Sequence, residues 1–154
     1  MTEEENGLPL YTLEQGSLEP VPTTSYMEAN VFEVRDLQPA IIKAIDAVAP
    51  GTLVIDKEHR GWEGKDLRID ILGIDKDGHP VVIELKRTDD GGALDLQALR
   101  YAAMVSTYTY ERVVEVFESY LSKSGRPTED ADRLLREHMG FEGASEAAID
   151  VDVT

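Results

Sequence analysis

Two short apolar runs joined by a turn constrain the fold of this chain more than any other feature. Residues 67–74 and 80–86 are rich in β-branched and other apolar side chains, and the segment between them contains Asp77-Gly78. An Asp-Gly pair between two such runs is typical of a β-hairpin. The sequence therefore predicts two adjacent antiparallel strands near the middle of the chain.

Charged residues interrupt both of these apolar runs. Asp70 lies inside the first run, and Glu84 and Lys86 lie inside the second. Because alternate residues of a strand share a face, the hairpin can present two carboxylates and an ammonium on one side. Buried charges are costly unless they are paired or bind a metal. Two interpretations follow: a salt bridge between Lys86 and one of the carboxylates, or a divalent cation held by both carboxylates beside Lys86.

A helix is predicted over residues 93–107, after a Gly-rich link. Gln97 and Tyr101 are four residues apart and therefore share one face of it. Each alone has an ordinary explanation, with Tyr101 in the core and Gln97 capping a strand carbonyl. Their place directly behind the charged hairpin favours a shared site. The apolar positions at helical spacing are Leu94, Ala98, Tyr101, Ala102 and Val105.

The order of these residues resembles the PD-(D/E)XK nuclease superfamily. Asp70 is followed after thirteen residues by Glu84-Leu85-Lys86, and then by the Gln and Tyr of the helix. The resemblance is in particular to RecB-type nucleases and to NucS-like, archaeal-type mismatch endonucleases, and it covers residues 32–106. It implies an α/β fold with a restriction-endonuclease-like core, in which helices flank a mixed β-sheet of about four strands and extra helices follow at the C-terminus.

The same resemblance implies a metal-dependent DNA endonuclease, acting in DNA repair or defence. Mg²⁺ or Mn²⁺ would be held by Asp70, Glu84 and the backbone carbonyl of Leu85, since hard cations prefer oxygen ligands. Lys86 would orient the attacking water and stabilise developing charge. The two helical residues, Gln97 and Tyr101, would position the site or contact a phosphate.

A further acidic residue completes the family's site, and the sequence leaves two candidates. Glu33 lies in a phrase, Glu33-Val-Arg-Asp-Leu37, that resembles the family's pattern, but Asn30 to Glu33 also has the spacing of a capping box. Pro39 is tolerated only in a helix's first turn, so a helix is predicted over residues 36–49. Glu58 is the substitute if Glu33 points away.

A strand is predicted over residues 52–58, before the hairpin. Two side chains that follow it, His59 and Trp62, could have served a function but are expected to have structural roles. His59 is expected at the surface of the strand's end rather than as a base. Trp62, the only tryptophan, is expected to pack against the sheet edge rather than to stack on a nucleic-acid base.

Three parts are expected along the chain: an extended acidic arm (1–29), which could add an edge strand over residues 8–13, the nuclease-like core (30–124), and a C-terminal part (125–154). The C-terminal part follows a helix over 108–123 and would hold a helix capped by Thr128 and stopped by Gly140, then a strand over 148–153. A nuclease core of the family described above usually has a further strand after the helix that carries Gln97 and Tyr101. The tail is therefore either that strand or the approach to one beyond the end, and the chain is expected to be a fragment of a longer protein.

The net charge of −16 argues against nucleic-acid binding at first sight. Its distribution weakens this objection, because residues 1–30 contribute −6, residues 125–154 contribute −5, and the middle of the chain only −5. Basic side chains of the middle, most of them more simply explained as solvated surface charge, could still meet phosphates. They are Lys57, Arg60, Lys65 and Arg68 in one group, and Arg87 and Arg100 in another.

Composition excludes several other chemistries. The chain has no cysteine, so disulfides, zinc-thiolate sites and cysteine nucleophiles are excluded. No signal peptide and no membrane-spanning apolar run is visible, so no membrane partner and a cytoplasmic location are expected. DNA is the expected partner, of a form that the sequence leaves open, and a homodimer is implied by the resemblance alone. The alternatives are a catalytically inactive binding module on the same fold, or an acidic interaction protein.

Overall fold

The computed structural model describes residues 9–61, 67–86 and 94–141 of the chain. The chain separates into two compact units, Met1–Val31 and Phe32–Thr154. Each unit has its own strands, and each is described by itself below.

The first unit is built on a two-stranded hairpin, not on the single edge strand expected over residues 8–13. Strand β1 (Tyr11–Glu14) pairs antiparallel with β2 (Ser17–Pro20) in a sheet of two strands. The turn residues Gln15 and Gly16 both have positive φ, 49° and 86°, as a tight hairpin turn of this kind requires. The prediction missed the turn because glutamine is an unusual residue at such a position.

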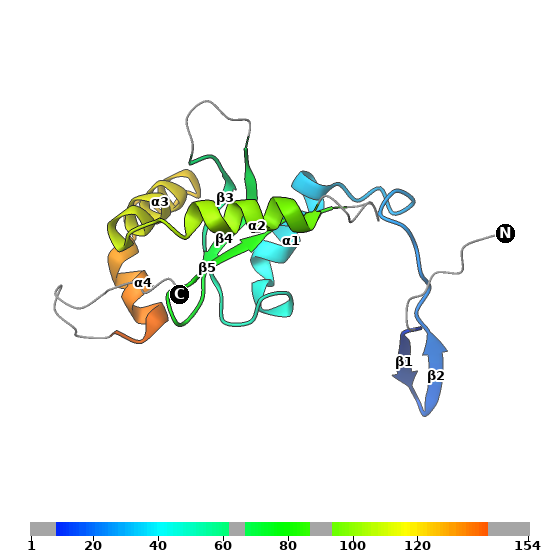
Figure 1. Ribbon diagram of the computed structural model, residues 1–154. Coiled ribbons are helices and arrows are strands. Elements are labelled where there is room, and N and C mark those ends of the chain that lie inside the picture. The colour runs from blue at the N-terminus through cyan, green and yellow to red at the C-terminus, as the bar shows by residue number, and fades with distance from the viewer. Residues whose placement is uncertain (1–8, 62–66, 87–93, 142–154) are drawn as a thin grey trace. The chain divides into compact units, whose positions relative to one another are not determined.

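The second unit contains a three-stranded antiparallel sheet in the order β3-β4-β5 (Figure 1). Its strands are β3 (Leu53–His59), β4 (Ile69–Ile74) and β5 (Pro80–Ile83). The predicted hairpin is therefore confirmed, and so is the mixed α/β class of the chain. The expected mixed sheet of about four strands is wrong for the described residues, whose strands all pair antiparallel. The proposed strand at 148–153 lies outside those residues.

Three short helical pieces replace the single helix expected over residues 36–49. A π-helical turn η1 (Glu33–Leu37) leads into α1 (Gln38–Lys43), and a 3₁₀ turn η2 (Ile45–Ala47) follows. The break falls at Ala44, whose φ and ψ of −123° and 45° are not helical. The capping box at Asn30 is wrong, because the cap is Phe32, whose backbone N–H donates to the Asp36 carboxylate at 2.9 Å.

The described part of the second unit also contains α2 (Leu94–Val105), α3 (Tyr110–Lys123) and α4 (Ala131–Met139). The side chain of Asp130, not the expected Thr128, caps α4 by accepting from the Arg133 N–H. Gly140 ends α4 with a φ of 76°, as its sequence position indicates. Within the described residues, no helix combines the length and the apolar character needed to cross a membrane.

Both faces of the sheet are covered, which makes β4 a buried central strand. Leu72 packs with Tyr101 of α2 and with residues of α3 and α4, whereas Ile71 packs with Ile41 and its neighbours on α1. Figure 1 shows α2 lying across the strands and α1 in a separate position beside them. Every residue of β4 is buried. Asp70 is therefore a buried carboxylate near the start of this strand.

Candidate functional site

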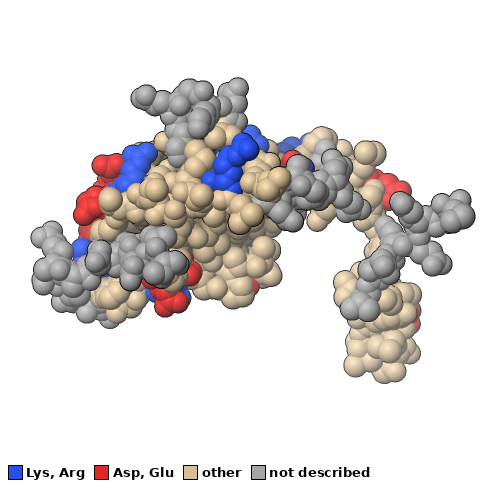
Figure 2. Space-filling model, in the orientation of Figure 1, with Lys and Arg blue, Asp and Glu red and all other residues tan. Residues whose placement is uncertain are grey.

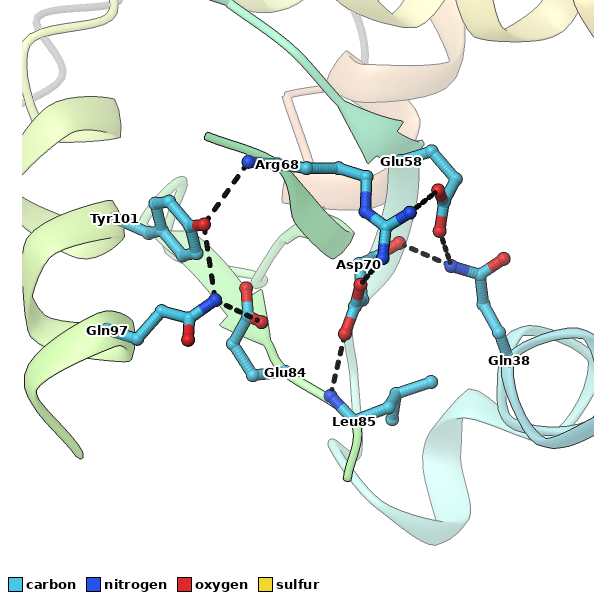
Figure 3. A network of polar contacts seen from close by, with 8 residues as sticks. All are labelled: Gln38, Glu58, Arg68, Asp70, Glu84, Leu85, Gln97 and Tyr101. Carbon is cyan, nitrogen blue, oxygen red and sulfur yellow. Dashed lines mark hydrogen bonds and ion pairs between the residues drawn. The ribbon is translucent and has the colours of Figure 1, made fainter. Parts of the chain in front are cut away.

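Asp70 and Glu84 lie side by side on the β4–β5 hairpin. The register pairs Ile71 with Ile83, and one further step along both chains places Asp70 opposite Glu84. One carboxylate oxygen of Asp70, Oδ2, accepts the backbone N–H of Leu85 at 2.9 Å. This hydrogen bond crosses the hairpin and fixes Asp70 against the segment that carries Glu84 (Figure 3).

Helix α2 brings Gln97 and Tyr101 to the same place (Figure 3). The Gln97 side-chain amide donates to Glu84 Oε2 at 3.3 Å and to the Tyr101 hydroxyl at 3.2 Å. The same hydroxyl accepts the backbone N–H of Arg68 at 3.2 Å. Tyr101 is 3% exposed, and its ring packs in the core. Both explanations offered for Tyr101 therefore hold at once, since its ring is core and its hydroxyl belongs to the polar network.

Glu84 is the least satisfied charge in this network. Burial first, and then the neighbouring negative charge of Asp70, raise the pKa of Glu84 to about 7. Its Oε1 atom is buried and accepts no hydrogen bond from the residues that the structure describes. Such atoms are rare in folded proteins, because the free energy lost on removing them from water is not offset by a hydrogen bond. The carboxylate is thus placed where a further ligand would satisfy it.

Arg68, not Lys86, is the cation that pairs with Asp70. The Arg68 guanidinium lies 2.6 Å from Glu58 Oε2 and 3.3 Å from Asp70 Oδ1. The salt bridge that the sequence suggested for Lys86 is therefore wrong. The basic partner of Asp70 is Arg68, which lies two residues before it and directly precedes β4. Lys86 is half-buried and makes no hydrogen bond or ion pair with the described residues.

Gln38 is a member of this network that the sequence did not indicate. It is 2% exposed, and its amide donates to Glu58 Oε1 at 2.8 Å and to the Asp70 backbone carbonyl at 2.9 Å. The sequence held one signal for Gln38. It lies one helical turn before Ile41 and Ile42, so it is a polar residue on the apolar face of α1. Gln38 thus joins α1 to both strands that carry the acidic residues.

Of the two candidates for a third acid, Glu58 is the one that the structure places beside Asp70. Its backbone has a φ of 54°, a left-handed conformation that is uncommon for a residue other than glycine. Such strain tends to gather at functional sites. Glu33 lies half-buried in η1, five residues before Gln38.

The three carboxylates are not gathered around one point. Among the described residues, a group of three with all ligand atoms within 4.8 Å of one another occurs in the β4–β5 turn, at Asp75, Asp77 and His79. There the Asp75 carboxylate already accepts the backbone N–H groups of Asp77 and His79, at 2.9 and 2.8 Å. This exposed cluster has the hydrogen bonding of an ordinary turn.

The prediction that His59 is a surface residue is wrong. His59 is 4% exposed, with Nδ1 2.6 Å from Asp56 Oδ2 and Nε2 2.8 Å from the Tyr108 hydroxyl. It does end β3, as expected. The sequence did not reveal its burial because Tyr108, which covers it, lies 49 residues away. Gly61 allows the contact, since a Cβ there would lie 2.2 Å from the hydroxyl oxygen of Tyr108.

A group of basic side chains lies beside β3 and α3. A polar cavity of about 280 Å³ there is lined by Lys57, Arg60, Arg112 and Lys123, together with acidic residues. Figure 2 shows the described basic groups of the visible face in separate patches. Arg68 is engaged by acids. Lys65, Arg87 and the expected packing of Trp62 lie outside the described residues.

No known family description, curated protein or solved structure matches this chain.

Proposed function

We propose that this protein hydrolyses phosphodiester bonds in DNA with the help of Mg²⁺ or Mn²⁺. The observation that carries the proposal is the Glu84 carboxylate beside Asp70, whose buried Oε1 atom accepts no hydrogen bond from the residues that the structure describes. Two adjacent carboxylates in a core are costly unless a cation joins them. The order of residues that resembles the PD-(D/E)XK nucleases supplies the reaction class.

The donor set fits a hard divalent cation. Asp70, Glu84 and the backbone carbonyl of Leu85 offer oxygen atoms, the ligands that Mg²⁺ and Mn²⁺ prefer. When Asp70, Glu84 and Glu58 are all ionised, they carry three negative charges against one positive charge on Arg68. A divalent cation would neutralise the remaining two.

Within this proposal, the cation when bound polarises the scissile phosphate and acidifies a water molecule. The chain's own residues do the rest. The Lys86 ammonium, which has no partner among the described residues, orients the water and stabilises the charge that develops on the phosphate. Gln97 holds the Glu84 carboxylate through its 3.3 Å hydrogen bond. Tyr101 fixes Gln97 and the start of β4.

The test measures metal binding and cleavage in matched variants. Calorimetry with Mn²⁺ should give binding for the wild type that is lost in Asp70→Asn, while Asp77→Asn, which alters the exposed turn cluster, should bind as the wild type does. Metal-dependent cleavage of labelled branched and single-stranded DNA should fall by about a hundredfold or more in Asp70→Asn. Binding lost in Asp77→Asn and kept in Asp70→Asn would overturn the proposal and move the metal to the turn.

A second candidate is a binding module without catalysis, favoured by the Arg68 ion pairs at Asp70 and by the net charge of −16. Such a protein would bind DNA equally well with metal or with a chelator present and would leave it uncut. Salt titration of binding to branched DNA by the wild type, in EDTA and in Mg²⁺, separates this candidate from the nuclease.

A further inference from the structure

We infer that Arg68 is a resident cation that competes with the divalent metal for Asp70 and has to release Asp70 when the metal binds. The inference rests on the proposed function, because it concerns the same site. It assigns to Arg68 a positioning role that neither the hairpin pattern nor the resemblance indicates.

The hydrogen bonding of Asp70 leads to this inference. Its Oδ2 accepts the Leu85 N–H at 2.9 Å, and its Oδ1 lies 3.3 Å from the Arg68 guanidinium. Both oxygens of the central carboxylate are therefore engaged (Figure 3). A metal that coordinates Asp70 has to share or displace one of these contacts. Of the two contacts, the metal would displace the one with the Arg68 guanidinium, because the metal and the guanidinium are both positive and repel each other.

The two ion pairs of Arg68 differ in strength. The contact with Glu58 is 2.6 Å long, whereas the contact with Asp70 is 3.3 Å long. Short charge-assisted contacts are the strong ones. Glu58 is itself held by the buried Gln38 amide at 2.8 Å. Arg68 can therefore give up Asp70 and stay attached to Glu58.

The backbone of Arg68 need not move in this exchange. Its N–H is fixed to the Tyr101 hydroxyl at 3.2 Å, and its side chain is 36% exposed. The guanidinium can thus rotate toward solvent on a fixed base. In that position its planar donors suit a phosphate oxygen of the substrate. Arg68 would then couple loading of the metal to binding of the scissile strand.

The first experiment compares Mn²⁺ affinity, measured by calorimetry, in the wild type, Arg68→Met and Arg100→Met. Arg100 lies exposed on α2, so its variant changes the net charge equally without touching the acids. Arg68→Met should bind Mn²⁺ about tenfold more tightly than the other two proteins, while Arg68→Lys, which keeps the charge, should fall between. Equal affinity in Arg68→Met and Arg100→Met would overturn the inference.

A second measurement follows metal binding in the wild type itself, and a variant serves only to assign the resonance. The Nε–H resonance of Arg68, identified by its absence in Arg68→Lys, should shift on saturation with Mg²⁺. An unchanged resonance in the metal-bound protein would overturn the inference and leave the proposed function standing. Failure of both the wild type and Arg68→Met to bind Mn²⁺ at millimolar concentration would overturn the two together.

Discussion

Two polar networks, one on β3 and the other on the β4–β5 hairpin, differ in how completely their charges are satisfied. The first, here the His59 network, consists of Asp56, His59 and Tyr108, and both ring nitrogens of the histidine have a partner. The second, here the Glu84 site, is centred on Asp70 and Glu84. In its Glu84 carboxylate, whose pKa is raised by burial, one buried oxygen accepts no hydrogen bond within the described part of the chain.

This difference separates a polar network that stabilises the fold from one that serves a ligand. A fully paired buried network is rigid and adds to stability, whereas a partly paired one costs stability. Proteins keep such costs where function requires them. Removing a charge from the His59 network should therefore destabilise the protein. Removing one from the Glu84 site should leave its stability unchanged or raise it.

The largest effect is expected for Asp56→Ala, because it leaves the Nδ1 side of a buried histidine without its partner at 2.6 Å. We expect the free energy of unfolding to fall by about 3 kcal/mol. Urea denaturation followed by circular dichroism measures it. Lys57→Ala, an exposed neighbour on the same strand, is the control and should change stability little. A loss under 1 kcal/mol in Asp56→Ala would remove the distinction between the two networks.

A smaller loss is expected for Gly61→Ala. The new Cβ would lie 2.2 Å from the Tyr108 hydroxyl oxygen and 2.8 Å from His59 Nε2, so the hydrogen bond between them has to break or the chain has to shift. We expect a loss of about 2 kcal/mol. In a Tyr108→Phe background, which lacks the hydroxyl, the same substitution should cost clearly less. Equal costs in both backgrounds would show that the clash is not with the hydroxyl.

Tyr101→Phe tests the link between the Glu84 site and the core. The ring stays, but the Gln97 amide and the Arg68 N–H lose the hydroxyl that accepts them, each at 3.2 Å. We expect a loss of about 1 kcal/mol in thermal or urea unfolding. Tyr120→Phe, at a half-buried position on α3, is the matched control. A variant as stable as the wild type would mean that these two donors find other partners.

The sequence predicted the parts of the fold that local patterns encode. The β4–β5 hairpin follows from two apolar runs around Asp77-Gly78, and α3 and α4 follow from apolar spacing and from Gly140. Capping residues and the broken helix at Ala44 were missed, because they depend on single backbone angles. The sheet's strand pairing was also misjudged where no turn signal marked it.

Some residues of the candidate site could likewise be predicted from the sequence, and others could not. The hairpin pattern and helical spacing suffice to bring Asp70, Glu84, Gln97 and Tyr101 together. Gln38 and Arg68 were not given roles, because the contacts of Gln38 span up to 32 residues of sequence and Arg68 was taken for a surface charge. The burial of His59 beside Tyr108 is a tertiary contact of the same kind.

The smallest effect is expected for Glu84→Gln, which should not lower the free energy of unfolding. It is the most direct test of the difference between the two networks. Glu84→Gln keeps the shape of the side chain and an oxygen for the Gln97 amide, but it removes a buried negative charge beside Asp70. In EDTA we expect the free energy of unfolding to stay the same or to rise by about 0.5 kcal/mol. Glu118→Gln, an exposed position on α3, controls for the change in net charge.

The effect of Mg²⁺ on stability should further distinguish the wild type from Glu84→Gln. Millimolar Mg²⁺ should raise the unfolding free energy of the wild type, since a ligand that binds only the folded state stabilises it. It should leave Glu84→Gln unchanged, because that variant lacks one of the two carboxylates. If Glu84→Gln instead lost more than 1 kcal/mol in EDTA, the Glu84 carboxylate would support the fold by itself. The Glu84 site would then belong with the His59 network as a structural element, and the case for a metal at Asp70 would lose its main support.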